Sequence, residues 1–403
     1  MLILVSDLHL RPGAATHLSR LAQFERFWGR IDQARRGEPA TLCFVGDLVD
    51  LVRAPDWLEG KHRPYHEPGA ALAAEVDALV GRTLEAEKPF LDAIRTQVDA
   101  GALRVALVVG NHDRLLHHAP AARARLRQAL GMPGGDAPFP SELRFPREGV
   151  LALHGHTVDQ LCHDPGGGPP LSDMIAAELI VRFPREIRRR AGLDHPRLDD
   201  IDDVRPVLAV PAWVRQLSES ADGGGRGKPR GLGRDIARTW QGLVEEFLDN
   251  GHVRGWFKDH HRRFKLDFAG KMKLLLNLST RHALATDSSL HLLNDAFFKF
   301  FDVRFAKAAL AALERPENRG LRYVVNGHTH FAAMTPLGLV DGRPACYFNL
   351  GTWRPVHQLG NLARGRAGFL AYDAMAYLAF FGQGDALGRE FEWWQGAAAS
   401  LPG

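Results

Sequence analysis

The stretch Leu2-Ile-Leu-Val-Ser-Asp-Leu-His9, close to the start of the chain, decides the fold that we expect. Its first four residues form an apolar run typical of a buried strand, and an Asp-x-His pair follows almost at once. Four further segments follow apolar runs in the same way: Gly46-Asp-Leu-Val-Asp50, Gly110-Asn-His-Asp113, His154-Gly-His156 and Gly327-His-Thr-His330. Residues i and i+2 of an extended chain point to the same side, so Asp-x-His and His-x-His can each present two ligands to one site.

Apolar runs alternate with segments of helical periodicity over the first 156 residues. Strands alternating with helices predict a layered α/β core, with functional residues at the C-terminal ends of the strands. Glycines that precede Asp47, Asn111 and His328 would allow the chain to leave its strand sharply. The expected strands are Leu2–Val5, Thr41–Val45, Arg104–Val109 and Leu151–Leu153, and the expected helices are His17–Ile31 and Ala70–Val98.

The alternation breaks at residue 157. Residues 157–320 have mostly helical propensity, with a glycine-rich stretch at 218–234 that we interpret as a loop. The strand pattern returns at Leu321–Val325, Ala345–Leu350 and Phe369–Tyr372. We therefore expect residues 1–156 and 321–403 to form one core, interrupted by a helical insertion or cap at 157–320.

Composition limits the compartment and the partners. The 403 residues include 51 Lys/Arg and 47 Asp/Glu, and this net charge of +4 is weak support for a nucleic-acid partner. The three cysteines are far apart and form no Cys-x-x-Cys motif, which argues against a disulfide scaffold. No apolar run approaches the roughly 18 residues that a membrane span needs. We expect a cytoplasmic protein, with peripheral contact at the inner membrane face as an alternative.

The five segments offer carboxylate, imidazole and amide ligands without thiolate. This set suits Mn²⁺, iron or Zn²⁺. The number of such groups is too large for one ion, whereas two ions about 3.5–4 Å apart, bridged by a shared carboxylate, can hold both oxygens of a phosphoryl displacement.

The order Asp-x-His, Gly-Asp-x-x-Asp, Gly-Asn-His-Asp, His and Gly-His-x-His resembles that of the calcineurin-like metallophosphoesterases. The resemblance runs from residue 7 to residue 330 and brackets the insertion. It implies a four-layer α-β-β-α sandwich of two mixed sheets, here with a large helical insertion. It also implies two metal ions, with Mn or Fe favoured and Zn compatible. The activity implied is hydrolysis of a phosphodiester, phosphomonoester or pyrophosphate bond by metal-bound hydroxide.

Carried over residue by residue, the resemblance assigns three ligands to each ion and one bridge. The first ion would be bound by Asp7, His9 and His330, the second by Asn111, His154 and His328, and Asp47 would bridge the two.

Other residues of the same segments receive supporting roles from the resemblance. His112 would lie over the substrate and protonate the leaving group, with Asp113 as its orienting partner. His156 competes with His154 for one ligand position, and we favour His154 because it follows the strand directly. Asp50 is interpreted as a supporting carboxylate, and Arg114 as either a phosphate-binding residue or one half of a surface ion pair.

Departures from the family pattern narrow the range of substrates that we expect. Leu51 stands where phosphoprotein phosphatases carry arginine, and Arg53 is displaced by two residues, which argues against a protein phosphatase. The stretch from His154 to Asp164 resembles that of UDP-2,3-diacylglucosamine pyrophosphatases, which cleave a lipid A precursor, although His156 replaces their usual Asp.

A basic segment of the insertion leaves further alternatives open. Residues 254–307 contain 11 Lys/Arg against 5 Asp/Glu, interleaved with phenylalanines. Such a segment could contact a lipid surface, bind single-stranded nucleic acid as in a nuclease, or simply pack on the core. The expected partner is a phosphorylated small molecule, a nucleotide or a lipid, and nucleic acid is not favoured. A non-catalytic binding module is least expected, because the chain retains every ligand.

Overall fold

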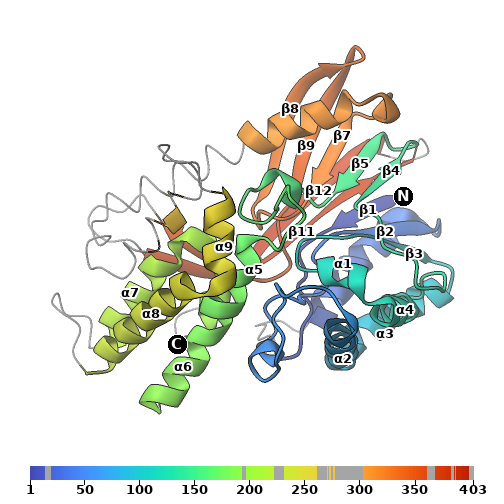
Figure 1. Cartoon of the computed structure of the whole chain (residues 1–403). Coiled ribbons are helices and arrows are strands. Elements are labelled where there is room, and N and C mark those ends of the chain that lie inside the picture. The colour runs from blue at the N-terminus through green and yellow to red at the C-terminus, as the bar shows by residue number, and fades with distance from the viewer. Residues whose placement is uncertain are drawn as a thin grey trace.

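The computed structural model describes residues 1–13, 20–192, 197–221, 231–260, 270, 272–273, 276, 303–360, 368–382, 385 and 387–398. In these residues the protein is an α/β structure with two mixed β-sheets and helices packed against them (Figure 1).

The first sheet begins with three parallel neighbours, β1 (Leu2–Val5), β2 (Ala40–Val45) and β3 (Leu103–Val108). Antiparallel pairing of β1 with β11 (Gly368–Phe380) continues the sheet. In the described residues its order is β3-β2-β1-β11-β10-β6, with β12 also paired to β11. The added strands are β6 (Val204–Arg205), β10 (Pro355–Gly360) and β12 (Phe391–Ala398).

The second sheet has the order β4-β5-β7-β9-β8 in the described residues. Its central strands β5, β7 and β9 are parallel, and its outer strands pair antiparallel to them. The strands are β4 (Glu142–Phe145), β5 (Val150–Leu153), β7 (Tyr323–Asn326), β8 (Ala332–Val340) and β9 (Arg343–Leu350).

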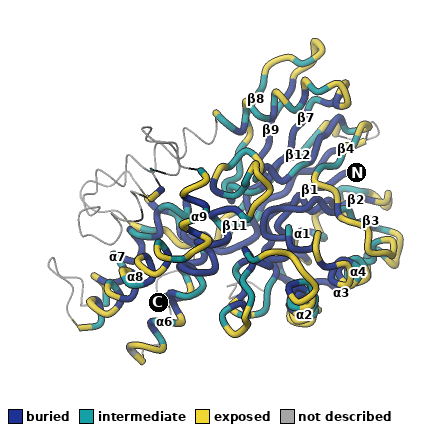
Figure 2. Tube along the Cα trace, in the orientation of Figure 1, coloured by how far each residue is buried: buried dark blue, intermediate teal, exposed yellow. Residues whose placement is uncertain are grey.

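The two sheets pack on each other through a shared apolar core. Leu4 and Val45 of the first sheet belong to the same buried cluster as Ala152, Val325 and Phe348 of the second. Figure 2 shows these central strands as the most buried part of the molecule. Burial on both faces explains why the strands read as continuous apolar runs instead of alternating ones.

Helices cover the outer face of each sheet. Residues 303–313 are helical, and Phe305 and Leu313 of this helix pack against Val324 and Tyr347 of the second sheet. The first sheet is covered by α1 (Arg20–Arg35), α2 (Ala70–Ala86), α3 (Lys88–Asp99) and α4 (Pro120–Ala129).

The single helix expected over Ala70–Val98 is wrong, because the chain forms α2 and α3 instead. Pro89 lies in the first turn of α3. A proline has no N–H to donate, and its ring clashes with the preceding turn, so the earlier helix cannot continue through it. Proline is well tolerated in a first helical turn, which is where the second helix begins.

Residues 157–320, which we call the cap, contain helices with a core of their own around Trp213, Trp240 and Phe247. The cap is not wholly helical, since β6 pairs with β10 through His357 and Gln358 and so joins the first sheet. Besides the helix at 303–313, which packs on the second sheet, the helices longer than one turn in its described residues are α5 (Leu171–Ile175), a π-helical turn (Ala176–Val181), α6 (Arg182–Ala191), α7 (Val210–Ala221), α8 (Gly231–Asp249) and α9 (Gly251–His260).

Two expectations fall largely outside the described residues. Most of the basic segment 254–307 lies there, and so do residues 222–230 of the expected glycine-rich loop. The flanks of that loop are helical, because α7 reaches Ala221 and α8 begins at Gly231. Among the helices in the described residues, none is both long and apolar enough to cross a bilayer.

Candidate metal centre

The loops that follow five strands converge on one region of the molecule. β1, β2 and β3 are parallel neighbours in the first sheet, and β5 and β7 are parallel neighbours in the second. The C-terminal ends of parallel strands share an edge, so the loops after them are brought together. Backbone hydrogen bonds fix the convergence: His9 N donates to Asp47 O (2.9 Å), and Gly327 N donates to His154 O (3.1 Å).

The backbone of these loops is strained where the ligands were predicted. Left-handed backbone is uncommon for residues other than glycine, and such strain clusters at functional sites. Among the described residues, the only other non-glycine positions with positive φ are Arg36 and Asp341. The strained positions here are Asp7 (55°), His9 (49°), Asp47 (52°), His328 (76°) and His330 (62°).

The glycines of these segments serve two different purposes. Gly46 has a φ of 84° and so needs the conformational freedom that the sequence predicted. Gly110 and Gly327 do not have positive φ, and the expectation that they permit forbidden backbone is wrong for them. A Cβ at Gly110 would overlap the carboxylate of Asp47, and a Cβ at Gly327 would overlap Ser6. Close approach of ligand loops explains these two glycines.

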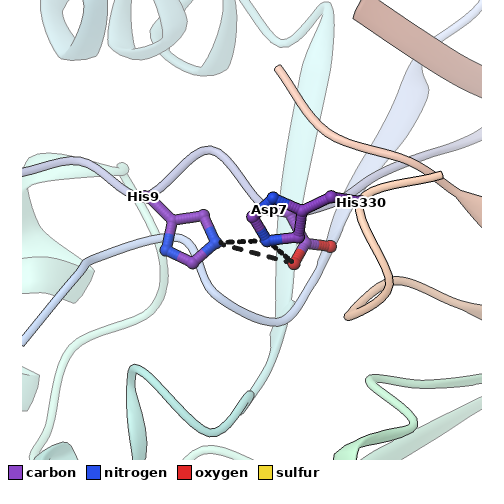
Figure 3. A group of neighbouring side chains, drawn as sticks. All are labelled: Asp7, His9 and His330. Carbon is purple, nitrogen blue, oxygen red and sulfur yellow. Dashed lines mark hydrogen bonds and ion pairs between the residues drawn. The ribbon is translucent and has the colours of Figure 1, made fainter. Parts of the chain in front are cut away.

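Asp7, His9 and His330 form the first group of ligand atoms (Figure 3). The Nε2 atoms of the two histidines are 3.0 Å apart. Asp7 Oδ1 lies 3.2 Å from His330 Nε2 and 3.6 Å from His9 Nε2, and it accepts no hydrogen bond. Its other oxygen accepts from His328 N (2.9 Å) and from the Ser6 hydroxyl. A buried carboxylate oxygen and two ring nitrogens therefore point at one spot.

Asn111, His154 and His328 form the second group. Asn111 Oδ1 lies 3.1 Å from His154 Nε2 and 3.1 Å from His328 Nδ1. His156, the rival candidate, is in none of the groups of possible ligands found in the described residues, and its ring centroid is 5.5 Å from that of His154.

Asp47 lies between the two groups. Its Oδ2 atom is 3.2 Å from His154 Nε2 and 3.7 Å from His9 Nε2, so one carboxylate reaches ligands of both groups. Its Oδ1 atom accepts from His112 N (2.8 Å). This is the position that a bridging carboxylate requires.

Three of the predicted ligand histidines are held in orientation by the ring nitrogen that points away from the centre. His9 Nδ1 faces Asp50 Oδ2 (3.1 Å), His154 Nδ1 faces Val45 O (2.9 Å), and His328 Nε2 faces Asp159 Oδ2 (3.2 Å). A ring that donates through one nitrogen keeps a lone pair on the other, which is the usual arrangement of a metal-binding histidine. In each ring the nitrogen that keeps the lone pair faces the centre.

His330 differs from the other three histidines. Arg205 Nε donates to His330 Nδ1 (3.0 Å), so the neutral ring carries its proton on Nε2. A cation on Nε2 would move this proton to Nδ1, and Arg205 would then have to leave that nitrogen.

The electrostatics around Asp47 and His154 favour positive charge, whereas burial lowers the pKa of His9, and burial with the charge of Arg205 lowers that of His330. Burial opposes ionisation of Asp7 and Asp47, but neighbouring histidines outweigh it and hold both pKa values below their ordinary range. Burial likewise opposes charge on His154, yet Asp47 and Asp7 raise its pKa to about 10. A field that retains a proton so strongly also favours a cation. The donor set, the orientations of the His9, His154 and His328 rings and the field around Asp47 fit a pair of divalent ions, and the His330 ring fits once Arg205 leaves its Nδ1.

Asp50 makes the contact with the His112 ring that the resemblance assigned to Asp113. Its Oδ1 atom lies 2.7 Å from His112 Nδ1, so Asp50 contacts both His112 and His9. The Asp113 carboxylate instead accepts from Val49 N (2.9 Å) and Gly110 N (3.0 Å), and it holds two loops together. The prediction that Asp113 orients His112 is therefore corrected. His112 also lies near enough to His9 and Asp47 to share a cation with them.

Arg114 is engaged away from the centre. Its Nε atom donates to Asp173 Oδ2 (2.7 Å), and its Nη2 atom donates to Pro64 O (2.8 Å). Of the two interpretations of this residue, the structure shows the ion pair, although its carboxylate partner is buried and not on the surface.

Two arginines reach the centre that sequence reasoning did not place there. Arg53 Nη2 lies 3.3 Å from His112 Nε2, while its Nη1 donates to Asp202 Oδ1 (2.9 Å) of the cap. Its spacing after Asp50 was a usable signal, because the Arg53 N–H donates to Asp50 Oδ1 and closes a tight turn. Arg205 comes from β6, whose pairing with β10 has no local signal in the sequence.

Neither a scan against protein-family models nor a search of the curated proteins finds a match to this chain.

Proposed function

We propose that this protein is a dinuclear-metal-dependent phosphoesterase of the calcineurin-like metallophosphoesterase type. Two mixed sheets with helices on their outer faces support the corresponding four-layer sandwich. The order of the five segments, which we read as a resemblance to that family, supports the same conclusion. Mn or Fe would be the preferred metals, with Zn also compatible with the ligands.

One observation carries the proposal: the carboxylate of Asp47 lies between two separate groups of ligand atoms. A single mononuclear site would need only one such group. Two groups that share a carboxylate match the two-ion arrangement that stabilises an in-line phosphoryl displacement.

When bound, the ions would supply positive charge that activates water and neutralises phosphoryl oxygens. Water would attack phosphorus, the bond from phosphorus to the ester oxygen would break, and the alcohol would leave. His112 would donate the proton that the departing oxygen needs. Asp50 fixes the His112 ring through Nδ1, and Nε2 accepts from Arg53 Nη2. Arg53 would therefore have to turn from Nε2 toward a phosphoryl oxygen before a proton held on Nε2 can reach the departing oxygen.

The test is hydrolysis of bis-p-nitrophenyl phosphate and p-nitrophenyl phosphate by chelator-treated protein, before and after Mn²⁺ is restored. We expect activity only with metal, and its near-complete loss in Asp47→Asn. Asp92→Asn is the matched control, because Asp92 is an exposed carboxylate of α3 that pairs with Lys88. If neither ester is cleaved with Mn²⁺, Fe²⁺ or Zn²⁺, the proposed function is wrong.

A further inference from the structure

The metal centre opens into a cavity of about 130 Å³ whose walls differ in chemistry. One wall is the centre itself, with Asp47, Asn111, His112, His328 and His330. The cap contributes much of the remaining lining, which we call the cap wall, including the aliphatic side chains of Ile175, Ile180, Ile201, Val207 and Leu208. A group attached to the reacting phosphate would therefore lie against hydrocarbon.

Two arginines line the cavity as well, Arg53 and Arg205. Guanidinium groups bind phosphate oxygens in a directed way and remain charged when buried. Arg53 is held by Asp202 and lies next to His112, and Arg205 lies next to His330. Both arginines are therefore placed beside the centre, where the phosphoryl group of a substrate would be.

The acidic side chains that also line the cavity are already engaged. Asp159 accepts from His328 and from Leu161 N, Asp173 accepts from Arg114, and Asp202 accepts from Arg53 and Arg354. A sugar or a nucleoside needs hydrogen-bond partners to compensate for its lost water, and leaving its hydroxyls unpaired is costly. The hydroxyls of Ser172 and Thr329 line the cavity too, but each already donates to a neighbour, Ser172 to Asp173 Oδ1 and Thr329 to Phe331 O. Most of the remaining lining is hydrocarbon, which offers such a group no partner.

We propose that this cavity selects phosphoesters whose leaving group is compact and apolar, such as a short alkyl or a single aryl group. The inference rests on the proposed function, and it adds the substrate class. An apolar cavity of about 150 Å³ is large enough to bind benzene. Because this cavity also has to hold the phosphoryl end, the organic group can have at most about six carbon atoms. Arg53 and Arg205 bind the phosphoryl end, and the cap wall binds the organic end.

The test is calorimetric binding of n-alkylphosphonates to the Mn²⁺-loaded protein, from methyl to hexyl. Burial of each methylene should raise affinity about fourfold, up to the length that fills the cavity. The polar isostere 2-methoxyethylphosphonate should bind at least severalfold more weakly than n-butylphosphonate. Phosphonates are not hydrolysed, so the readout does not depend on catalysis.

Two variants separate the two walls. Leu208→Asn keeps the side-chain size but makes the cap wall polar, and it should flatten the chain-length dependence while methylphosphonate binds as before. Leu370→Asn is the matched control, because Leu370 is 62% exposed on β11 and should change nothing. Arg53→Gln should lower the binding affinity of every phosphonate by a similar factor, whatever its chain length.

Affinity that is independent of chain length, or tighter binding of the polar isostere, would overturn the inference. Failure of every phosphonate to bind would overturn it too. None of these three results bears on the proposed function, which is tested separately by metal-dependent ester hydrolysis.

Discussion

Exchange of Asp50 for asparagine tests the reassigned roles of the two carboxylates. Asp50 is fully buried, and its two oxygens face His112 Nδ1 (2.7 Å) and His9 Nδ1 (3.1 Å). Asparagine fills the same space but has only one acceptor oxygen, so its NH₂ group would face one of the two ring N–H groups. One histidine would lose its orienting partner.

Loss of such a partner typically costs 10–100-fold in metal affinity or activity. At about 1.4 kcal/mol per tenfold, this corresponds to about 1.4–2.7 kcal/mol. The assay is kcat/KM for bis-p-nitrophenyl phosphate measured across a Mn²⁺ titration. A loss at His9 would raise the Mn²⁺ concentration needed for half-activation, whereas a loss at His112 would lower kcat at saturating Mn²⁺.

The paired variant is Asp113→Asn. Burial, helped by the charge of Asp47, raises the pKa of Asp113 to about 7, and its oxygens accept from two backbone amides. Asparagine would lose one of these hydrogen bonds and leave a buried backbone N–H without an acceptor, at a cost of about 1–3 kcal/mol in unfolding free energy. We expect lower stability in Asp113→Asn with turnover within a few-fold of the parent. The reverse pattern, with turnover lost in Asp113→Asn and preserved in Asp50→Asn, would refute the reassignment.

Three further predictions concern Asp202 of the cap, Gly110 and His112. Burial opposes ionisation of Asp202, but the charges of three arginines hold its pKa well below the ordinary value, so the stability it adds is present above about pH 4 and is lost as pH falls further. Urea unfolding should therefore show Asp202→Asn to be less stable at neutral pH, with a difference that shrinks below pH 4; a constant difference would contradict this. Gly110→Ala should abolish activity and reduce bound metal, because the new Cβ overlaps Asp47, whereas Gly29→Ala meets nothing within 4 Å and should be neutral or stabilising by both measurements. His112→Ala should lower turnover but retain bound metal, and a variant that loses both ions would instead make His112 a ligand.

The strands and the residues that follow them could be predicted because both signals are local. A run such as Leu2–Val5 identifies a buried strand, and the polar residues after it must lie at the strand end. The break at Pro89 is also a local signal. The prediction of a single helix is wrong because it extends the helical periodicity across this proline.

The partners of the site residues depend on contacts between distant loops. Asp113 adjoins His112 in sequence, but the residue that contacts the ring is Asp50, on the loop after the neighbouring strand. Arg205 reaches His330 because two residues of the cap join the first sheet, and nothing in those two residues signals the pairing. Tertiary pairing of this kind is set by the whole fold.

The most direct test of the central claim is the metal content of the folded protein. Protein stripped with chelator, supplied with Mn²⁺, Fe²⁺ or Zn²⁺ and dialysed should retain about two ions per chain, as a bridged centre requires. In Asp47→Asn this number should fall, because the carboxylate shared by both groups is gone. Folded protein that retains one ion or none with all three metals would contradict the account.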